Sequence, residues 1–236
     1  MDSSSISISV IMPAFNEESN IRSAVHQNIE TFSSKGLDFE IIIIDDKSSD
    51  RTREIGDELA KEFPHVRCFY HEENLGPGGA FKTGVMQSNK EYIIFVPFDN
   101  PLTVEDIEVY LPRVGNCDII VGVRVARVGY SKIARFASFF YNRILIPLMF
   151  NIGISDLNWI QIYRRKHFSD GTLKISNTQI FFLVEILVQA KEKQLIIAEV
   201  PSKMKRRLYG TPTCERFSTM WVTFFDAVKF FIKINK

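Results

Sequence analysis

Cysteine is scarce in this chain, and its spacing excludes two common kinds of small domain. The three cysteines are Cys68, Cys117 and Cys214. An odd number of widely separated thiols forms neither a disulfide framework nor a zinc site built from close ligand pairs. The cysteines therefore favour a reducing compartment over an oxidising one.

We expect neither a secretory signal nor a transmembrane helix. Residues 1–9 contain no basic cluster and no long apolar stretch, both of which a secretory signal has. The apolar segment 133–150 contains Arg135 and Arg143, whereas a spanning helix needs about 20 mostly apolar residues. The chain has no low-complexity linker. With 236 residues, 45% of them hydrophobic, it is predicted to form a single domain over residues 1–236.

The net charge is small because two strongly charged halves cancel. The formal net charge is +1. Residues 1–120 carry 10 basic and 21 acidic residues, a balance of −11, and residues 121–236 carry 19 and 7, a balance of +12. This asymmetry indicates anionic partners for the second half, although two faces that attract each other would also explain it.

Strand-like and helix-like segments alternate through the first half. Buried strands are expected at 6–12, 39–44, 66–70, 92–98 and 118–123, and helices at about 17–32, 52–63 and 79–88. Strands that alternate with helices of this length form parallel sheets with crossover helices. The sequence therefore predicts an α/β fold.

Two amphipathic helices are expected in the second half, at 131–150 and 217–234. In the first helix one polar stripe contains Ser131, Arg135, Ser138 and Asn142. In the second helix the apolar face contains Phe217, Met220, Trp221, Phe224, Phe225, Val228 and Phe231, and the opposite face contains Thr219, Thr223, Asp226 and Lys233. Such helices either pack into a core or lie in a membrane interface, and periodicity alone leaves both open.

Acidic side chains stand at the ends of predicted strands. Asp45 and Asp46 end the second strand, and Asp99 follows the fourth. Ligands of open α/β sheets bind beyond the carboxyl ends of the strands, so these carboxylates are expected to face one crevice. There they can bind a base, a ribose hydroxyl or a hard cation. Capping of the next helix would explain one of the three.

A glycine-rich segment, 74–84, precedes or opens the third helix. Its sequence is Asn-Leu-Gly-Pro-Gly-Gly-Ala-Phe-Lys-Thr-Gly. Glycines at such a place let backbone N–H groups approach a phosphate. A dinucleotide fingerprint would instead follow the first strand. By itself this segment is a weak signal.

Taken in order, these segments resemble the family 2 glycosyltransferases, and within them the dolichyl-phosphate mannosyltransferase and polyprenyl-phosphate sugar transferase group. The resemblance runs from Ile8 to about Gly210. Its members are Met-Pro-Ala-Phe-Asn-Glu-Glu (12–18), Ile-Ile-Asp-Asp-Lys-Ser-Ser-Asp (43–50), the segment 74–84, Asp-Ile-Ile-Val-Gly-Val-Arg (118–124), and Glu-Val-Pro (199–201) followed by Arg206 and Arg207. The ordered set is specific, whereas no single member is.

The resemblance implies an A-type, Rossmann-like glycosyltransferase fold with a mostly parallel sheet. Residues 1–123 would form the nucleotide-sugar half, and 124–236 the half that faces the acceptor and the membrane. The implied enzyme, of the hexosyltransferase kind, transfers a sugar with inversion from a nucleotide-diphosphate sugar to a polyprenyl phosphate at the cytoplasmic membrane surface. Two alternatives stay open: transfer to a hydroxyl of a surface polysaccharide or glycan, and nucleotide-sugar binding without turnover.

Two segments depart from the family pattern. The Asp-x-Asp metal motif reads Pro97-Phe98-Asp99, so an Mg²⁺ or Mn²⁺ ion would rest on Asp99 and the diphosphate. The Gly-Phe-Arg segment is also missing, because Asp156 is followed by Leu-Asn-Trp-Ile-Gln-Ile-Tyr.

The resemblance also implies roles for individual residues. Asp99, as metal ligand, would act with Arg124 and Arg206 or Arg207 on the leaving diphosphate. The nucleotide-sugar site would contain Pro13, Phe15, Asn16, Glu17, Ile44, Asp45, Asp46, Gly76, Phe98, Arg124 and Arg206. Asp156, Gln161 and Glu185 are candidates for the acceptor side, and Asp156 and Glu185 for a general base.

An acceptor phosphate, unlike a hydroxyl, needs no general base, because it is already an anion. Basic residues that would position it are Lys203, Lys205, Arg206, Arg207, Arg124, Arg127 and Arg135. They stand among Phe-rich stretches, which argues against nucleic acid as the partner. We expect peripheral attachment to the membrane on the cytoplasmic side, with an anchoring partner subunit as a further expectation.

Overall fold

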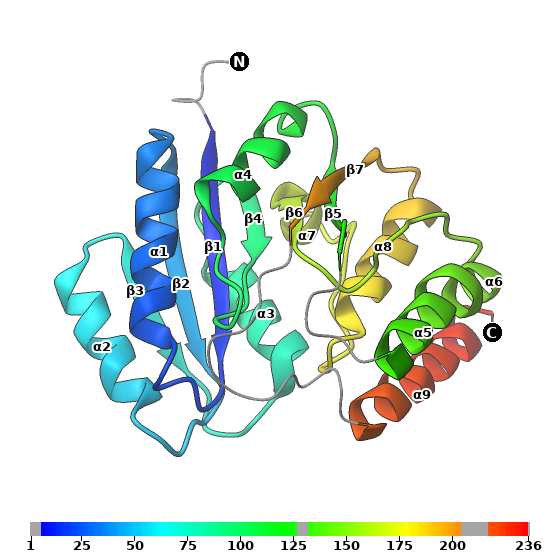
Figure 1. The fold of residues 1–236 in the computed structure, drawn as a ribbon, viewed down its shortest axis with the longest axis horizontal. Coiled ribbons are helices and arrows are strands. Elements are labelled where there is room, and N and C mark those ends of the chain that lie inside the picture. The colour runs from blue at the N-terminus through cyan, green and yellow to red at the C-terminus, as the bar shows by residue number, and fades with distance from the viewer. Residues whose placement is uncertain (1–5, 127–131, 204–216, 236) are drawn as a thin grey trace.

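A single seven-stranded sheet organises the described part of the chain. The structure is a computed structural model and describes residues 6–126, 132–203 and 217–235. The strands are β1 (Ser7–Ala14), β2 (Asp38–Asp45), β3 (Val66–Tyr70), β4 (Tyr92–Phe95), β5 (Ile119–Arg124), β6 (Gln161–Arg164) and β7 (Ile197–Ser202). Their order across the sheet is β3-β2-β1-β4-β6-β5-β7 (Figure 1).

The sheet is mostly parallel, as predicted, with one antiparallel strand. β1 pairs in parallel with β2 and β4, β2 with β3, and β5 with β7. β6 runs antiparallel between β4 and β5. The carboxyl ends of the other six strands therefore lie at one edge of the sheet. β6 was not predicted, because its four residues carry too little pattern to indicate a strand.

Helices cover both faces of the sheet. They are α1 (Ile21–Ser34), α2 (Thr52–Glu62), α3 (Gly76–Gln87), α4 (Val104–Tyr110), α5 (Lys132–Phe140), α6 (Ile146–Phe150), α7 (Lys166–Ser169), α8 (Phe182–Glu192) and α9 (Phe217–Ile234). A 3-10 turn (Leu111–Arg113) follows α4, and a π-helical turn (Tyr141–Leu145) joins α5 to α6.

Alternate side chains of the strands enter two hydrophobic cores. In β1, Val10 and Met12 pack on the side of α1, α2 and α4, whereas Ile11 packs on the side of α3 and α8. All four isoleucines of β2, 41–44, are fully buried. Burial on both faces is what the continuous apolar runs predict for parallel strands.

In the amphipathic helices of the second half, two polar residues are buried, whereas basic and several apolar residues are exposed. α5, α6 and α9 lie together at one end of the molecule (Figure 1). Asn142, predicted on a polar stripe, is buried and accepts a hydrogen bond from the Leu157 N–H at 2.9 Å. In α9, Thr223 is buried while Phe225 is exposed. Ser131 lies outside the described residues.

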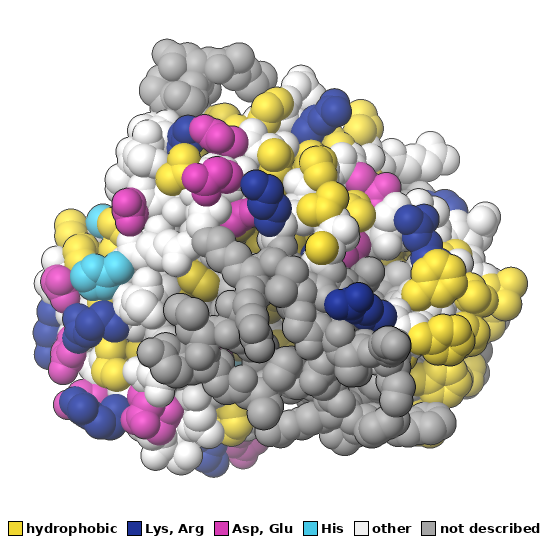
Figure 2. All heavy atoms as spheres, in the orientation of Figure 1, with side chains coloured by type: hydrophobic (Ala, Val, Ile, Leu, Met, Phe, Trp, Pro, Cys, Tyr) yellow, Lys and Arg dark blue, Asp and Glu magenta, His cyan; other side chains and the backbone are white. Residues whose placement is uncertain are grey.

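An exposed apolar surface results on these helices. We call it the outer apolar face and define it by the exposed residues Phe136, Phe139, Phe140, Ile144, Leu148, Val222, Phe225, Ile232 and Ile234. Figure 2 shows hydrophobic side chains gathered at this end, next to Lys and Arg side chains. Among the described residues, no helix has both the length and the apolar character required to cross a bilayer.

The contact between α3 and β1 can be tested at a glycine. A methyl group on Gly84 would overlap the buried side chain of Ile11. We expect Gly84→Ala to lower the free energy of unfolding by about 1–3 kcal/mol, the usual cost of overpacking a dense core. Gly153→Ala is the matched control, because nothing lies within 4 Å of its Cβ position. Urea denaturation measures both variants, and equal stabilities would contradict this packing.

Candidate active site

The predicted site residues are distributed along the carboxyl edge of the sheet. Asp45 and Asp46 stand at the end of β2, Asp99 follows β4, and Arg124 is the last residue of β5. Because β2, β4 and β5 run in the same direction, these ends share one edge. The expectation that the three carboxylates stand at one edge agrees with the topology. Arg127, Lys205, Arg206, Arg207 and Gly210 lie outside the described residues.

The loop after β1 is fastened to the loop after β2. Asn16 adopts a left-handed conformation with φ 57°, which asparagine tolerates better than most residues. Its N–H donates to Ser48 Oγ at 2.9 Å, and its Oδ1 accepts from the Ser49 N–H at 2.8 Å. The Glu17 N–H donates to Thr52 Oγ1 at 2.7 Å. The Asn-Glu motif therefore builds this corner of the site.

The two adjacent aspartates have different surroundings. Asp46 is buried, and its carboxylate accepts from the Leu75 N–H at 2.8 Å and the Gly76 N–H at 2.7 Å. Oδ1 of Asp46 also lies 2.7 Å from Nδ1 of His71. Asp45 is buried as well, but its Oδ1 has no hydrogen-bond partner among the described residues. Asp45 thus carries an unoccupied acceptor, whereas Asp46 holds the neighbouring loop.

His71 connects Asp46 to α3. Its second ring nitrogen, Nε2, lies 2.8 Å from Thr83 Oγ1. His71 was not among the predicted site residues, although a histidine directly after a strand that ends at this edge was a usable signal.

The glycines of the segment 74–84 serve packing. The Gly76 N–H is engaged by Asp46, and the Gly78 N–H donates to the carbonyl of Thr178 at 2.7 Å. A Cβ on Gly78 would overlap the backbone of Asn177. Gly76 has φ +75°, a conformation that favours glycine. Neither N–H is left for a phosphate, so the phosphate-binding role expected for this segment has no support at these two positions.

Glu185 holds the segment against which these glycines pack. It is 1% exposed and accepts from the N–H groups of Ser176 at 3.0 Å and Asn177 at 2.9 Å. The hydroxyl of Ser176 donates to the same carboxylate. A carboxylate that is 1% exposed and bound by three donors is not placed to remove a proton from an acceptor. The structure thus gives Glu185 a loop-binding role in place of the predicted general base.

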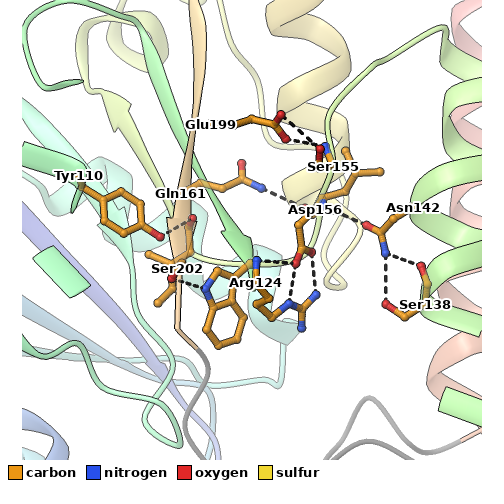
Figure 3. Close-up of polar contacts among 12 residues, drawn as sticks. Tyr110, Arg124, Ser138, Asn142, Ser155, Asp156, Gln161, Glu199 and Ser202 are labelled. Carbon is orange, nitrogen blue, oxygen red and sulfur yellow. Dashed lines mark hydrogen bonds and ion pairs between the residues drawn. The ribbon is translucent and has the colours of Figure 1, made fainter. Parts of the chain in front are cut away.

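Asp156 binds Arg124 in a buried ion pair (Figure 3). The guanidinium donates from Nε to Oδ2 at 2.7 Å and from Nη2 to Oδ1 at 2.7 Å, and the backbone N–H of Arg124 reaches Oδ2 at 3.2 Å. The guanidinium carbon also lies 4.8 Å from the ring centre of Trp159. Both carboxylate oxygens of Asp156 are thus engaged by Arg124, so the structure shows this carboxylate as the partner of the arginine.

Gln161, predicted on the acceptor side, lies inside the protein. It is fully buried in β6. Its Nε2 donates to the carbonyl of Leu157 at 3.0 Å, and its Oε1 accepts from the Tyr163 hydroxyl at 2.7 Å. It is therefore not placed to touch an acceptor. Phe98 and Ile44 are likewise buried, whereas Phe15 is 53% exposed beside the end of β1.

Among the described residues, Asp99, the carboxylate expected to bind a metal, is not part of a cluster of potential metal ligands. Asp99 is half-buried. In the described ranges, no three His, Cys, Asp or Glu side chains are grouped so as to hold a metal ion. Mg²⁺ in nucleotide sites is usually bound by one or two carboxylates together with substrate phosphates. Asp99 therefore fits a cation that arrives with a diphosphate, and the described residues do not form a self-sufficient protein site.

Comparisons with known proteins bear on the family and the fold. The sequence matches the family profile described as Glycosyl transferase family 2 over residues 9–229. It is 28% identical over 134 residues to dolichyl-phosphate beta-glucosyltransferase ALG5A of Trichomonas vaginalis and 28% identical over 204 residues to glycosyltransferase AglD of Haloferax volcanii. These alignments cover 52% and 83% of this chain but 42% and 32% of the relatives, so the chain spans less than half the length of either.

A solved structure shares the fold. It is glucosyl-3-phosphoglycerate synthase of Mycobacterium tuberculosis, in complex with Mn²⁺, uridine diphosphate and phosphoglyceric acid. The TM-score is 0.72 over 97% of this chain and 79% of that chain, at 15% identity. At this identity the likeness shows the fold, and the predicted A-type α/β fold is confirmed.

The buried ion pair between Arg124 and Asp156 is expected to contribute to stability. Asp156→Leu leaves the guanidinium of Arg124 buried without its carboxylate, which we expect to lower the free energy of unfolding by about 3–5 kcal/mol. The double variant Arg124→Met with Asp156→Leu removes both charges and is expected to recover much of that loss. Chemical denaturation of the single and double variants measures the coupling. Additive losses would show that the two side chains do not depend on each other.

Proposed function

Because this chain belongs to glycosyl transferase family 2 and is a glycosyltransferase, we propose that it transfers a sugar with inversion from a nucleotide-diphosphate sugar to a polyprenyl phosphate. The relative from Trichomonas vaginalis is named for transfer to dolichyl phosphate. That name supports the acceptor class, and the residues of the site supply the rest of the argument.

Asp45 is the residue we assign to the nucleoside. A buried carboxylate oxygen without a partner costs free energy, which a donor group from a bound ligand would recover. A base N–H or a ribose hydroxyl is such a donor. The exposed ring of Phe15 directly follows Ala14, the residue that pairs with Asp45 across β1 and β2, and we assign this ring to cover the base. Asp46 contributes indirectly, because its carboxylate binds the N–H groups of the Leu75–Gly76 turn.

Arg124 is assigned to the leaving diphosphate. Negative charge grows on the diphosphate as the sugar leaves, and a guanidinium already fixed at the edge of the sheet stabilises it without reorganisation. A divalent cation bound with the donor supplies further positive charge, and Asp99 is the described carboxylate that would hold it. The neighbour from Mycobacterium tuberculosis was solved with Mn²⁺ and uridine diphosphate, which supports a cation bound together with a nucleotide.

We choose a phosphate as the acceptor because both candidate bases are already bound by other groups of the protein. A hydroxyl acceptor has to lose a proton to a nearby base, whereas a phosphate attacks as the anion it already is. Asp156 is bound bidentately to Arg124, and Glu185 is saturated by Ser176 and Asn177. A phosphate acceptor is the chemistry that needs neither of them.

Product formation tests the proposal. Incubation with a panel of nucleotide sugars, Mg²⁺ or Mn²⁺ and a short polyprenyl phosphate is expected to yield a lipid-linked sugar. Asp45→Asn removes a charged acceptor and is expected to raise the donor KM by about tenfold or more. Glu30→Gln, an exposed change on α1, is the matched control and should behave as the parent enzyme. Donor binding without product across the panel would refute the proposed reaction.

The outer apolar face supports attachment to an anionic bilayer on the cytoplasmic side. Helices with apolar residues outward and basic residues beside them lie in membrane interfaces. Segment 132–150 contains no acidic residue, and its exposed Arg135 and Arg143 would lie near anionic headgroups, as would Lys229 and Lys233 of α9. A polyprenyl phosphate resides in that same membrane. An anchoring partner subunit stays a prediction.

Vesicle binding measures this attachment. We expect the triple variant Phe136→Ser, Phe139→Ser, Leu148→Ser to reduce co-sedimentation with phosphatidylserine-containing vesicles by at least about tenfold, because each side chain loses burial in lipid. Met86→Ser, which removes an equally exposed apolar side chain from α3, is the matched control. Undiminished vesicle binding by the triple variant would contradict the proposal. The proposal would also be contradicted if the parent protein did not bind vesicles and formed a dimer that the triple variant does not form.

A further inference from the structure

Trp159 is in contact with the arginine that the proposed reaction uses. The guanidinium carbon of Arg124 lies 4.8 Å from the centre of the indole ring, and Asp156 holds the same guanidinium by two hydrogen bonds of 2.7 Å. The guanidinium carbon thus lies over the indole ring, while the guanidinium nitrogens bind the carboxylate. Together the indole and the carboxylate restrict both the tilt and the rotation of a side chain that is otherwise among the most flexible.

The indole is itself fixed in place. Trp159 Nε1 donates to Ser202 Oγ, at the end of β7, at 2.8 Å. On the other side Trp159 packs against Gly122, where an added Cβ would lie 2.9 Å from Cδ1 of the indole and would overlap the hydroxyl of Tyr110. A side chain at position 122 would therefore crowd both the Tyr110 hydroxyl and the indole ring. The glycine of the segment Gly-Val-Arg leaves room for these two side chains.

We infer that Trp159 is a positioning residue that fixes the guanidinium of Arg124 toward the leaving diphosphate. This inference rests on the proposed function and adds a residue to it. Trp159 is 8% exposed, so it acts through Arg124 and has little surface with which to bind substrate itself. Its contribution grows as charge develops on the diphosphate, because stabilisation of that charge depends on a donor held in place before the reaction. Trp159 is therefore expected to affect kcat more than the donor KM.

Substitutions of different shape separate positioning from filling of space. Trp159→Phe keeps an aromatic face for the guanidinium and is expected to retain most of kcat. Trp159→Leu keeps an apolar side chain without that face, and we expect kcat to fall by about tenfold to hundredfold while the donor KM changes by less than about threefold. Equal losses in both variants, in proportion to their loss of thermal stability, would show a purely structural role.

Fluorescence provides a readout that does not require turnover. The chain contains two tryptophans, Trp159 and Trp221. In a Trp221→Phe background, Trp159 is the single indole fluorophore, and uridine diphosphate with Mg²⁺ is expected to shift its emission because the diphosphate attracts the guanidinium stacked on it. Arg124→Met in the same background should abolish the shift. If calorimetry detects nucleotide binding but the emission of Trp159 does not change, the inference is overturned.

Failure of the inference is distinguishable from failure of the proposed function. A parent enzyme that forms no lipid-linked product with any donor refutes the function. A parent enzyme that is active, loses activity in Arg124→Met and keeps full kcat in Trp159→Leu refutes only the positioning role of the tryptophan.

Discussion

Buried carboxylates at the carboxyl edge of the sheet need hydrogen-bond donors or a counter-ion from the protein itself. The local structure at this edge follows from which group each carboxylate binds. A buried anion without partners is costly, so each attracts donors from a different part of the chain. Asp46 takes the N–H groups of the turn before α3, and Glu185 takes those of the segment 176–177. Asp156 takes the guanidinium at the end of β5. Each bond fastens a loop that borders the site.

These bonds connect the two halves of the chain. The turn held by Asp46 packs through Gly78 against Thr178, in the segment that Glu185 holds. A continuous set of hydrogen bonds therefore runs from the end of β2 to the start of α8. Asp45 stands at one end of this set with an acceptor oxygen unoccupied by the described residues. The contrast between neighbouring aspartates explains how one carboxylate serves the fold while the next can serve a ligand.

The charge asymmetry of the sequence has a partial counterpart in the structure. The acidic half contains the carboxylates of the nucleotide side, although many of its acids form ordinary surface ion pairs, such as Glu58 and Glu62 with Arg22. In the basic half, Arg124 lies within the site, whereas Arg135 and Arg143 lie beside exposed apolar side chains. Positive charge and apolar surface thus occur together at the end of the molecule formed by α5, α6 and α9.

The sequence by itself determined the alternation of strands and helices, the α/β class and the ordered motifs of the family, because these depend on local patterns of a few residues each. It did not reveal β6, whose four residues make a strand only between β4 and β5. It left the environment of the amphipathic helices open, because periodicity separates two faces without saying which one meets the protein.

Only the tertiary structure decided the roles of the individual carboxylates. The partners of Asp46 and Asp156 come from 25 to 32 residues away along the chain, at distances in sequence that no local motif spans.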